Sequence, residues 1–216
     1  MKKERANPYI WVTWLTKLMA GESQCEWSSW FRAHYKWDKA PGDFDLAKWT
    51  TEHNELLHNR RNQLEAEGFI VYIEDQNSFK MIGKTGINVS GKADIVAIKE
   101  GEAYVEDCKT GNPKNSDHMQ VMVYMLALPI VTTHCKGLSL DGRIVYKDSI
   151  VEIPVFKIDD GLKTLFKNTV LTTGGNKPPK KVPSWGECRY CDISKADCSE
   201  RIDSEPTAAA QDHDLF

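Results

Sequence analysis

Two carboxylates and a lysine follow one another along this sequence in an order that suits metal-assisted hydrolysis. Asp94 comes first, and Asp107 and Lys109 follow it with one residue between them. Carboxylate oxygens are the ligands that Mg²⁺ and Mn²⁺ prefer in proteins. A metal held this way polarises a phosphate and lowers the pKa of an attacking water, while a nearby lysine positions that water or offsets developing charge. We therefore interpret Asp94, Asp107 and Lys109 as a candidate site for phosphodiester hydrolysis.

A predicted β-hairpin brings these three residues together. Apolar and β-branched runs at residues 93–98 and 103–108 flank the turn-like residues 99–102. Successive strand residues point to opposite faces, so Asp107 and Lys109 share one face with Val105, whereas Glu106 lies on the other. Asp94 then lies on the partner strand. Because Glu106 faces away, we expect its replacement by alanine to leave much of the activity.

A predicted helix follows the breaker sequence TGNP at residues 110–113. Gln120 and Tyr124 are four residues apart, so they lie on one face of this helix. The helix is apolar on most sides, which predicts burial against the sheet, and Pro129 is expected to end it.

The ordered set of these residues resembles the core of the PD-(D/E)XK nucleases, and within them the branch of RecB-type nuclease domains and Cas4 exonucleases. Asp94 matches the metal-binding aspartate, Asp107 and Lys109 match the (D/E)XK pair, and Gln120 with Tyr124 matches the Q-x-x-x-Y helix motif. Ala93 stands where the superfamily name has proline, and Asp107 replaces the commoner glutamate; both departures occur in such enzymes. The resemblance implies an α/β fold with a mixed β-sheet flanked by helices.

The resemblance also implies a histidine on a helix upstream of the first aspartate. Residues 44–67 predict a long helix that ends at Gly68, with an apolar stripe of Leu46, Trp49, Leu56 or Leu57, and Leu64. His53 falls on this stripe, whereas His58 lies on the polar face. His53 is therefore the candidate metal ligand, and the alternative is a core histidine with its hydrogen bonds satisfied.

Three of the six cysteines are spaced like metal ligands. Cys188, Cys191 and Cys198 form a Cys-x₂-Cys-x₆-Cys pattern that lacks a fourth ligand, and Cys25 can complete it if the ends of the chain meet. The spacing alone suits a structural zinc site equally well. The resemblance implies a [4Fe–4S] cluster on these four cysteines that joins the N- and C-terminal segments, with residues 184–199 as the cysteine segment. Cys108 and Cys135 are interpreted as small buried hydrophobes.

Composition is that of one globular domain. The chain has 216 residues, of which 41% are hydrophobic and 27% charged, and no run approaches the ~18 apolar residues of a membrane helix. Residues 1–202 are predicted to form a single domain. The start of the chain faintly imitates a signal peptide, but Lys17 interrupts the apolar run, so we expect a cytoplasmic protein. A net charge of −3 means that a nucleic-acid-binding surface must concentrate its basic residues locally.

The remaining elements follow from periodicity and turn signals. Helices are expected at residues 8–20, 23–35 and 159–169, and strands at 69–74, 81–89 (or an extended loop), 130–133 and 150–156. Residues 138–149 predict a hairpin that turns at Asp141-Gly142, and residues 174–183 an irregular basic linker. Six of the seven tryptophans precede residue 50; they are interpreted as core, with base stacking as the alternative.

The C-terminal residues 203–216 lack apolar periodicity until the final Leu215 and Phe216, which predicts a disordered tail. Gln211 followed by Leu215-Phe216 resembles the bacterial sliding-clamp-binding peptide, so a clamp is a candidate partner.

Taken with the resemblance, the sequence predicts a Mg²⁺- or Mn²⁺-dependent DNA nuclease, in particular an exonuclease on single-stranded ends that acts in replication, recombination, repair or CRISPR-type processing. A second hypothesis is a non-catalytic nucleic-acid-binding or scaffold protein with a structural metal, against which the complete set of Asp94, Asp107 and Lys109 argues. A third is a sequence-specific endonuclease, for which no base-reading element is identified.

Overall fold

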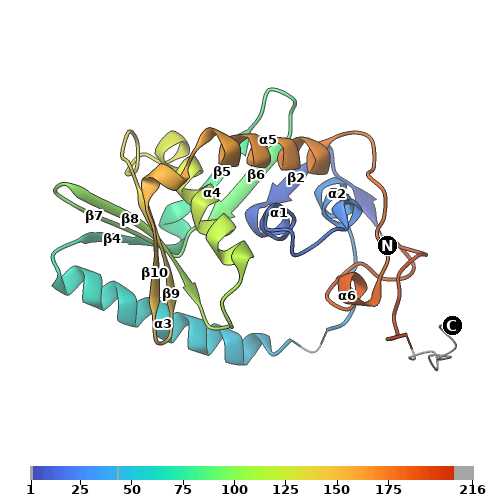
Figure 1. Ribbon diagram of the computed structural model, residues 1–216, viewed down its shortest axis with the longest axis horizontal. Helices are drawn as coiled ribbons and strands as arrows, with labels where there is room; N and C mark the ends of the chain where they lie inside the picture. The colour runs from blue at the N-terminus through green and yellow to red at the C-terminus, as the bar shows by residue number, and fades with distance from the viewer. Residues whose placement is uncertain (1, 43, 207–216) are drawn as a thin grey trace, which may run out of the picture.

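The computed structural model describes residues 2–42 and 44–206, and a five-stranded sheet forms one side of it, on the left in Figure 1. The strand order is β10-β9-β8-β7-β4. These strands are β4 (Ile70–Ile73), β7 (Ile95–Lys99), β8 (Glu102–Lys109), β9 (Asp141–Tyr146) and β10 (Ile150–Ile153). Only the β8–β9 pair is parallel within this sheet, so the expectation of a mixed sheet is confirmed.

Two helices cover the two faces of this sheet. Helix α4 (Asn115–Val131) packs on β8 and β9, and its Val121, Tyr124 and Leu128 belong to the larger hydrophobic core. Helix α3 (Leu46–Ala66) packs on β4, β7 and β8 and buries Leu57 and Leu64 in a second core. The strand alternation predicted for β8 is therefore confirmed, because Val105 joins the α4 core and Cys108 the α3 core.

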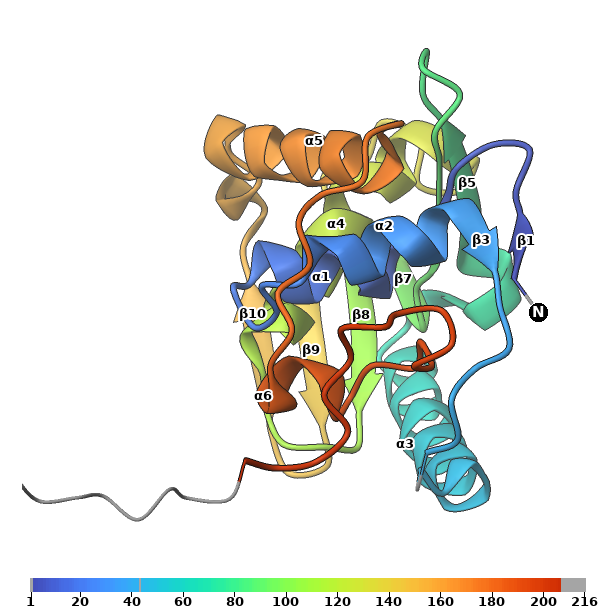
Figure 2. The same ribbon diagram turned by 90° about the vertical axis from the view of Figure 1, so that its right-hand side faces the viewer.

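A second, three-stranded sheet and the remaining helices lie beyond α4 (Figures 1 and 2). This sheet has the order β2-β6-β5. Its strands are β2 (Tyr9–Trp11), β5 (Ser78–Ile82) and β6 (Asn88–Lys92), and a two-stranded ladder joins β1 (Lys3–Glu4) to β3 (Tyr35–Lys36). The helices are α1 (Val12–Met19), α2 (Glu26–His34), α5 (Asp160–Gly174) and α6 (Trp185–Cys188), with short 3₁₀ turns at Glu74–Asn77 and Val155–Lys157. Helix α1 packs on α4, and α5 packs on α1 and α2.

The N- and C-terminal segments dock on one another, as the sequence led us to expect. Ile193 is fully buried against Trp30 and Phe31 of α2. Polar contacts join the same segments: Arg32 Nε donates to Asp192 Oδ1 at 2.9 Å, and Ser23 Oγ donates to Glu187 Oε2 at 2.8 Å. Figure 2 shows α6 and the chain around it lying beside α2 and the loop that leads to α3. Apolar packing and hydrogen bonds therefore already hold the two ends together.

Two expectations for the N-terminal half are wrong in detail. Residues 8–20 are not one helix, because Tyr9–Trp11 form a strand that pairs in parallel with β6 before α1 begins. Residues 81–89 are neither a single strand nor a loop, since β5 and β6 form a hairpin there. In the first case a partner strand distant in the sequence decides the local conformation, which apolar periodicity alone does not reveal.

The expected hairpin turn at Asp141-Gly142 is also wrong, because Asp141 begins β9 and the turn to β10 falls at residues 147–149. Gly142 serves packing instead. A Cβ at this position would lie 2.5 Å from Val121 Cγ1 and 2.6 Å from Met125 Sδ, so α4 can approach the strand only over a glycine.

The C-terminal end of α4 and the extent of α5 differ from expectation. Helix α4 includes Pro129 and ends at Val131, so residues 130–133 form no strand. Pro129 has no N–H to donate to the carbonyl of Met125, and the helix ends two residues later. Helix α5 continues to Gly174, five residues past the expected end at 169.

The N-terminal part of α3 departs from the predicted apolar stripe. Leu57 and Leu64 are buried, but Leu46 is 63% and Trp49 38% exposed. Figure 1 shows the first turns of α3 extending past the sheet, where no strand covers them. Core packing is confirmed for Trp30, and Trp27 and Trp37 pack against the same cluster, whereas Trp49 is an exception.

Within the described residues, no helix is both long and apolar enough to cross a membrane. Gln211, Leu215 and Phe216, the proposed clamp-binding residues, lie outside the described part of the chain. Clamp binding stays a prediction, and loss of binding to the host's sliding clamp when residues 211–216 are removed would support it.

Candidate active site

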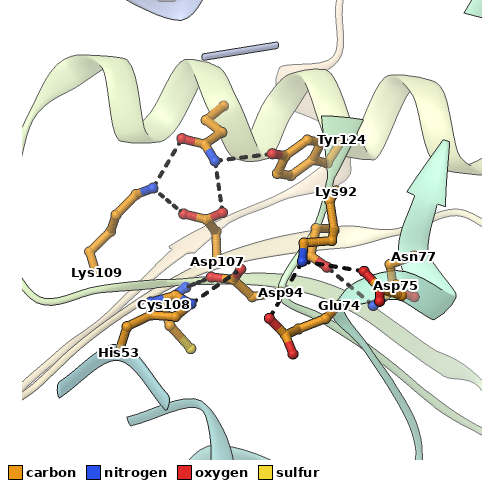
Figure 3. Close-up of polar contacts among 12 residues, drawn as sticks. His53, Glu74, Asp75, Asn77, Lys92, Asp94, Asp107, Cys108, Lys109 and Tyr124 are labelled. Carbon is orange, nitrogen blue, oxygen red and sulfur yellow. Dashed lines mark hydrogen bonds and ion pairs between the residues drawn. The ribbon is translucent and has the colours of Figure 1, made fainter. Parts of the chain in front are cut away.

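The β7–β8 hairpin places Asp107 and Lys109 at one end of the five-stranded sheet (Figure 3). Asp107 is almost fully buried, at 1% exposure, and its Oδ2 lies 2.5 Å from Lys109 Nζ. Both side chains leave the face of β8 that α4 covers, as the alternation predicts. The expected pairing of a carboxylate with an ammonium at this strand end is therefore present in the structure.

Helix α4 completes this pair through Gln120. The side-chain amide donates from Nε2 to Asp107 Oδ1 at 2.9 Å, and Gln120 Oε1 accepts from Lys109 Nζ at 3.0 Å. One glutamine therefore bridges both charged groups. The same Nε2 lies 3.0 Å from the hydroxyl of Tyr124, one turn further along the helix. The four-residue spacing of Gln120 and Tyr124 thus fixes the amide orientation that orders Asp107 and Lys109.

Asp94 lies in the bend between β6 and β7, one residue before the strand on which it was expected, and is held by the backbone of β8. Its Oδ2 accepts a hydrogen bond from the Cys108 N–H at 2.7 Å, which leaves Oδ1 facing His53 of α3. His53 is buried, and its Nε2 lies 3.6 Å from Asp94 Oδ1. Figure 3 shows α4 on one side of Asp107 and His53 on the other. His58 is exposed.

Burial and charge shift the protonation of these groups. Burial raises the pKa of Asp107 to about 7, with the charge of Asp94 adding to the rise and Lys109 opposing it. For Lys109, burial alone would lower the pKa, but the Asp107 carboxylate outweighs it and the pKa lies above its ordinary value. The neighbouring Asp94 carboxylate raises the pKa of His53. In the absence of a metal ion, Asp107 is therefore protonated more readily than an ordinary aspartate.

A divalent cation bound beside Asp107 would favour the ionised form of its carboxyl group. Mg²⁺ is commonly held by one or two carboxylates and completes its shell with water and phosphate oxygens. His53 Nδ1 is buried without a hydrogen-bond partner among the described residues, and Asp107 Oδ2 is buried with Lys109 Nζ as its ion-pair partner. No group of three or more His, Cys, Asp or Glu side chains within residues 2–42 and 44–206 is arranged to hold a metal ion. The candidate ligands for a divalent cation are therefore Asp94 and Asp107, and His53 lies beside them.

Several polar residues near the site were not identified from the sequence. Asp117 is buried on α4, where its Oδ2 accepts from the Tyr146 hydroxyl at 2.9 Å. Its position three residues before Gln120 could have indicated the shared helix face. Lys92 lies beyond Asp94 in Figure 3, with its Nζ 3.5 Å from Glu74 and 3.4 Å from Asp75. No local pattern marks that trio, since Lys92 lies on β6 and the two carboxylates lie on the turn Glu74–Asn77.

The opposite face of β8 carries a buried ion pair that the sequence did not reveal. Glu106 is fully buried and accepts two hydrogen bonds of 2.7 Å from Arg60 of α3. Arg143 Nη1 approaches Glu106 Oε1 at 3.3 Å from β9. Hydrogen bonding to Glu106 raises the pKa of Arg60. This face of β8 therefore stabilises the fold. Because replacing Glu106 would disturb that ion pair, Glu106 does not suit a control substitution.

The four cysteines singled out by spacing line a common pocket. Cys25 precedes α2, Cys188 ends α6, and Cys191 and Cys198 follow in the C-terminal segment. Arg32 Nη2 lies 3.7 Å from Cys191 Sγ, and Lys181 and Arg201 also line the pocket. All six cysteines are free thiols. The fold thus brings Cys25 to the C-terminal triplet, although no metal-ligand group is formed among the described residues.

Comparison with known proteins bears directly on this site. The family model described as the PD-(D/E)XK nuclease superfamily matches residues 16–196, which include Asp94, Asp107 and Lys109. Among solved structures, the chain is similar to one titled "Crystal structure of SSO0001", with 17% identity and a TM-score of 0.44 over 88% of this chain and 85% of that one. The comparison with curated proteins found no significant match. Because the family model spans most of the sequence together with the candidate site, the chain belongs to the PD-(D/E)XK nuclease superfamily.

Proposed function

We propose that this protein is a metal-dependent DNA exonuclease that acts on single-stranded ends. Members of its superfamily are usually metal-dependent nucleases. The observation that carries the proposal is the cluster of Asp94, Asp107 and Lys109 at one strand end, with Gln120 bridging the last two. A scaffold protein would have no need for an almost fully buried carboxylate whose pKa is raised to about 7.

Each side chain has a role that follows from its contacts. Asp94 and Asp107 would hold Mg²⁺ or Mn²⁺, with His53 as a further ligand beside Asp94. When bound, the ion would polarise the scissile phosphate and lower the pKa of the attacking water. Lys109, which is paired with Asp107, would orient that water and offset the negative charge that develops on the phosphate. Gln120 and Tyr124 hold Asp107 and Lys109 in place.

Positive charge is concentrated locally despite the net charge of −3. The side chains of Lys3, Arg5, Lys36 and Lys80 line one depression of the surface, together with Glu4. Such a group suits contact with a phosphate backbone, which supplies much of the affinity of nucleic-acid-binding proteins. The overall charge therefore does not argue against a DNA substrate.

The proposal predicts degradation of DNA from its ends in the presence of Mg²⁺ or Mn²⁺. Single-stranded and duplex oligonucleotides labelled at the 5′ or the 3′ end would be incubated with the purified protein, with and without EDTA. We expect short products from single strands first, and no products with EDTA. Cleavage of closed circular DNA at the same rate would contradict the exonuclease assignment but not the nuclease assignment.

We further propose that the domain formed by residues 1–202 lies in the RecB/Cas4 branch, works in the cytoplasm, and binds a [4Fe–4S] cluster. The support is the pocket that Cys25 shares with Cys188, Cys191 and Cys198, lined also by cationic side chains that suit a thiolate-rich cluster. Bound there, a cluster would add a covalent link between segments that hydrogen bonds and apolar contacts already join.

Protein purified without oxygen is expected to be brown and to contain about four iron and four sulfide per chain. Cys25→Ser and Cys191→Ser should both lose the iron and lower the melting temperature by similar amounts, because each removes one ligand. Cys135→Ala, a buried cysteine outside the pocket, is the matched control and should keep the iron. One zinc ion per chain and no iron would show that the four cysteines bind zinc instead of a cluster.

A further inference from the structure

An exposed apolar surface lies at the start of α3. Phe44 is 68%, Leu46 63% and Trp49 38% exposed. None of them belongs to the hydrophobic clusters formed by the described residues, whereas Leu57 and Leu64 on the same helix are buried in one. A tryptophan and a phenylalanine left in water forgo a large gain from burial. The two rings are therefore candidates for contact with a bound molecule.

This surface is continuous with the candidate active site. The ring of Trp49 stacks on the imidazole of His53, with centroids 4.8 Å apart and planes 15° from parallel. Phe44 contacts Trp49 in turn, with centroids 6.2 Å apart. On its other side His53 approaches Asp94, with Nε2 3.6 Å from Oδ1. Phe44, Trp49 and His53 thus form a row from an exposed ring to a buried carboxylate site.

We propose that Trp49, with Phe44 beside it, forms a stacking platform for an unpaired base of the DNA held at the site. This inference rests on the proposed nuclease function and specifies its substrate. Flat aromatic faces bind bases without sequence preference, because every base offers a π-face. In the interior of a duplex those faces are covered by neighbouring base pairs, so an unpaired end offers the platform more stacking surface than a duplex does. An end that stacks on Trp49 would be anchored one helical turn from His53 and next to the carboxylates.

Binding rather than cleavage tests the platform, because Trp49 also supports His53 and its loss would disturb the site. The assay uses the Asp107→Asn protein, a fluorescent single strand and a blunt duplex of the same sequence, without divalent metal. We expect Trp49→Ala to weaken single-strand binding by about five- to 100-fold. Trp49→Phe should retain most of the affinity, since a phenyl ring still stacks. Duplex affinity and the dependence of affinity on salt should not change, because no cationic group is lost.

Phe156→Ala is the matched control, since Phe156 is 73% exposed on the turn Val155–Lys157 and lines none of the pockets described above. Its single-strand affinity should equal that of the parent. Circular dichroism melting of each variant separates loss of folding from loss of binding. Single-strand affinity of Trp49→Ala within twofold of the parent would overturn the inference, as would equal losses for single strand and duplex. Cleavage by the unmodified protein is measured separately. If that protein does not cleave DNA but Trp49→Ala still weakens single-strand binding, the nuclease function is rejected and the stacking platform is kept.

Discussion

Asp107→Asn is expected to lower Mg²⁺-dependent DNA cleavage at least about 10³-fold while the protein stays folded. The substitution keeps the shape of the side chain and its contact with Gln120, but it removes the negative charge that faces Lys109. Metal binding depends on that charge, because hard divalent cations require anionic oxygen donors. Initial rates at saturating Mg²⁺ measure the loss. Asp94→Asn and Lys109→Met should be nearly as inactive, and combining them should add little, since the three act as a unit.

Two exposed residues at the far end of the same hairpin supply matched controls. Glu102→Gln removes a carboxylate from β8 and Lys99→Met an ammonium from β7, and both residues are exposed. Both variants should cleave DNA at the parental rate. A readout independent of activity is the melting temperature, which Mg²⁺ should raise for the parent but not for Asp107→Asn. An equal rise in both proteins would mean that the ion binds elsewhere.

Glu106→Ala is expected to cost about 3–5 kcal/mol of the free energy of unfolding. The substitution leaves the guanidinium of Arg60 buried without the two 2.7 Å hydrogen bonds that satisfy it. The substitution removes a smaller share of the contacts of Arg143, because its guanidinium also lies 3.5 Å from Glu152 and over the ring of Tyr104. Urea denaturation at constant pH gives the change in free energy. Reduced activity of this variant at higher temperature would then reflect unfolding and not a catalytic role for Glu106.

Replacing Arg60 and Glu106 together shows whether the Glu106→Ala variant is destabilised by an unpaired buried guanidinium or by the loss of the ion-pair attraction. Arg60→Met combined with Glu106→Leu should recover much of the stability, since well-packed apolar side chains often substitute for a buried ion pair at little cost. Glu102→Ala, an exposed carboxylate on the same strand, should change stability by less than about 0.5 kcal/mol. A loss below about 1 kcal/mol for Glu106→Ala would show that Arg60 finds other partners.

The candidate site could be predicted from the sequence because its geometry depends on two short periods. The two-residue period of a strand places Asp107 and Lys109 on one face, and the four-residue spacing on a helix places Gln120 beside Tyr124. Only one tertiary contact, α4 on β8, was needed to join them. The inward orientation of His53 followed in the same way from the stripe on α3 that also carries Leu57.

Features that depend on partners distant in the sequence could not be predicted. The Arg60–Glu106 pair joins residues 46 positions apart, and nothing in the sequence around either marks the other. Gly142 was interpreted as a turn residue, because the sequence does not show that Val121 and Met125 of α4 would leave no room for a side chain. Trp49 matched the apolar stripe, but whether a helix end is covered depends on the extent of the sheet.

The most direct test of the nuclease assignment is the rate at which end-labelled single-stranded DNA is degraded in Mg²⁺ by the unmodified protein and by Asp107→Asn, prepared and assayed side by side. The site described above predicts rapid EDTA-sensitive degradation by the first and a rate at least about 10³-fold lower for the second. Equal rates for the two proteins would contradict the assignment of Asp107 and its neighbours as the active site.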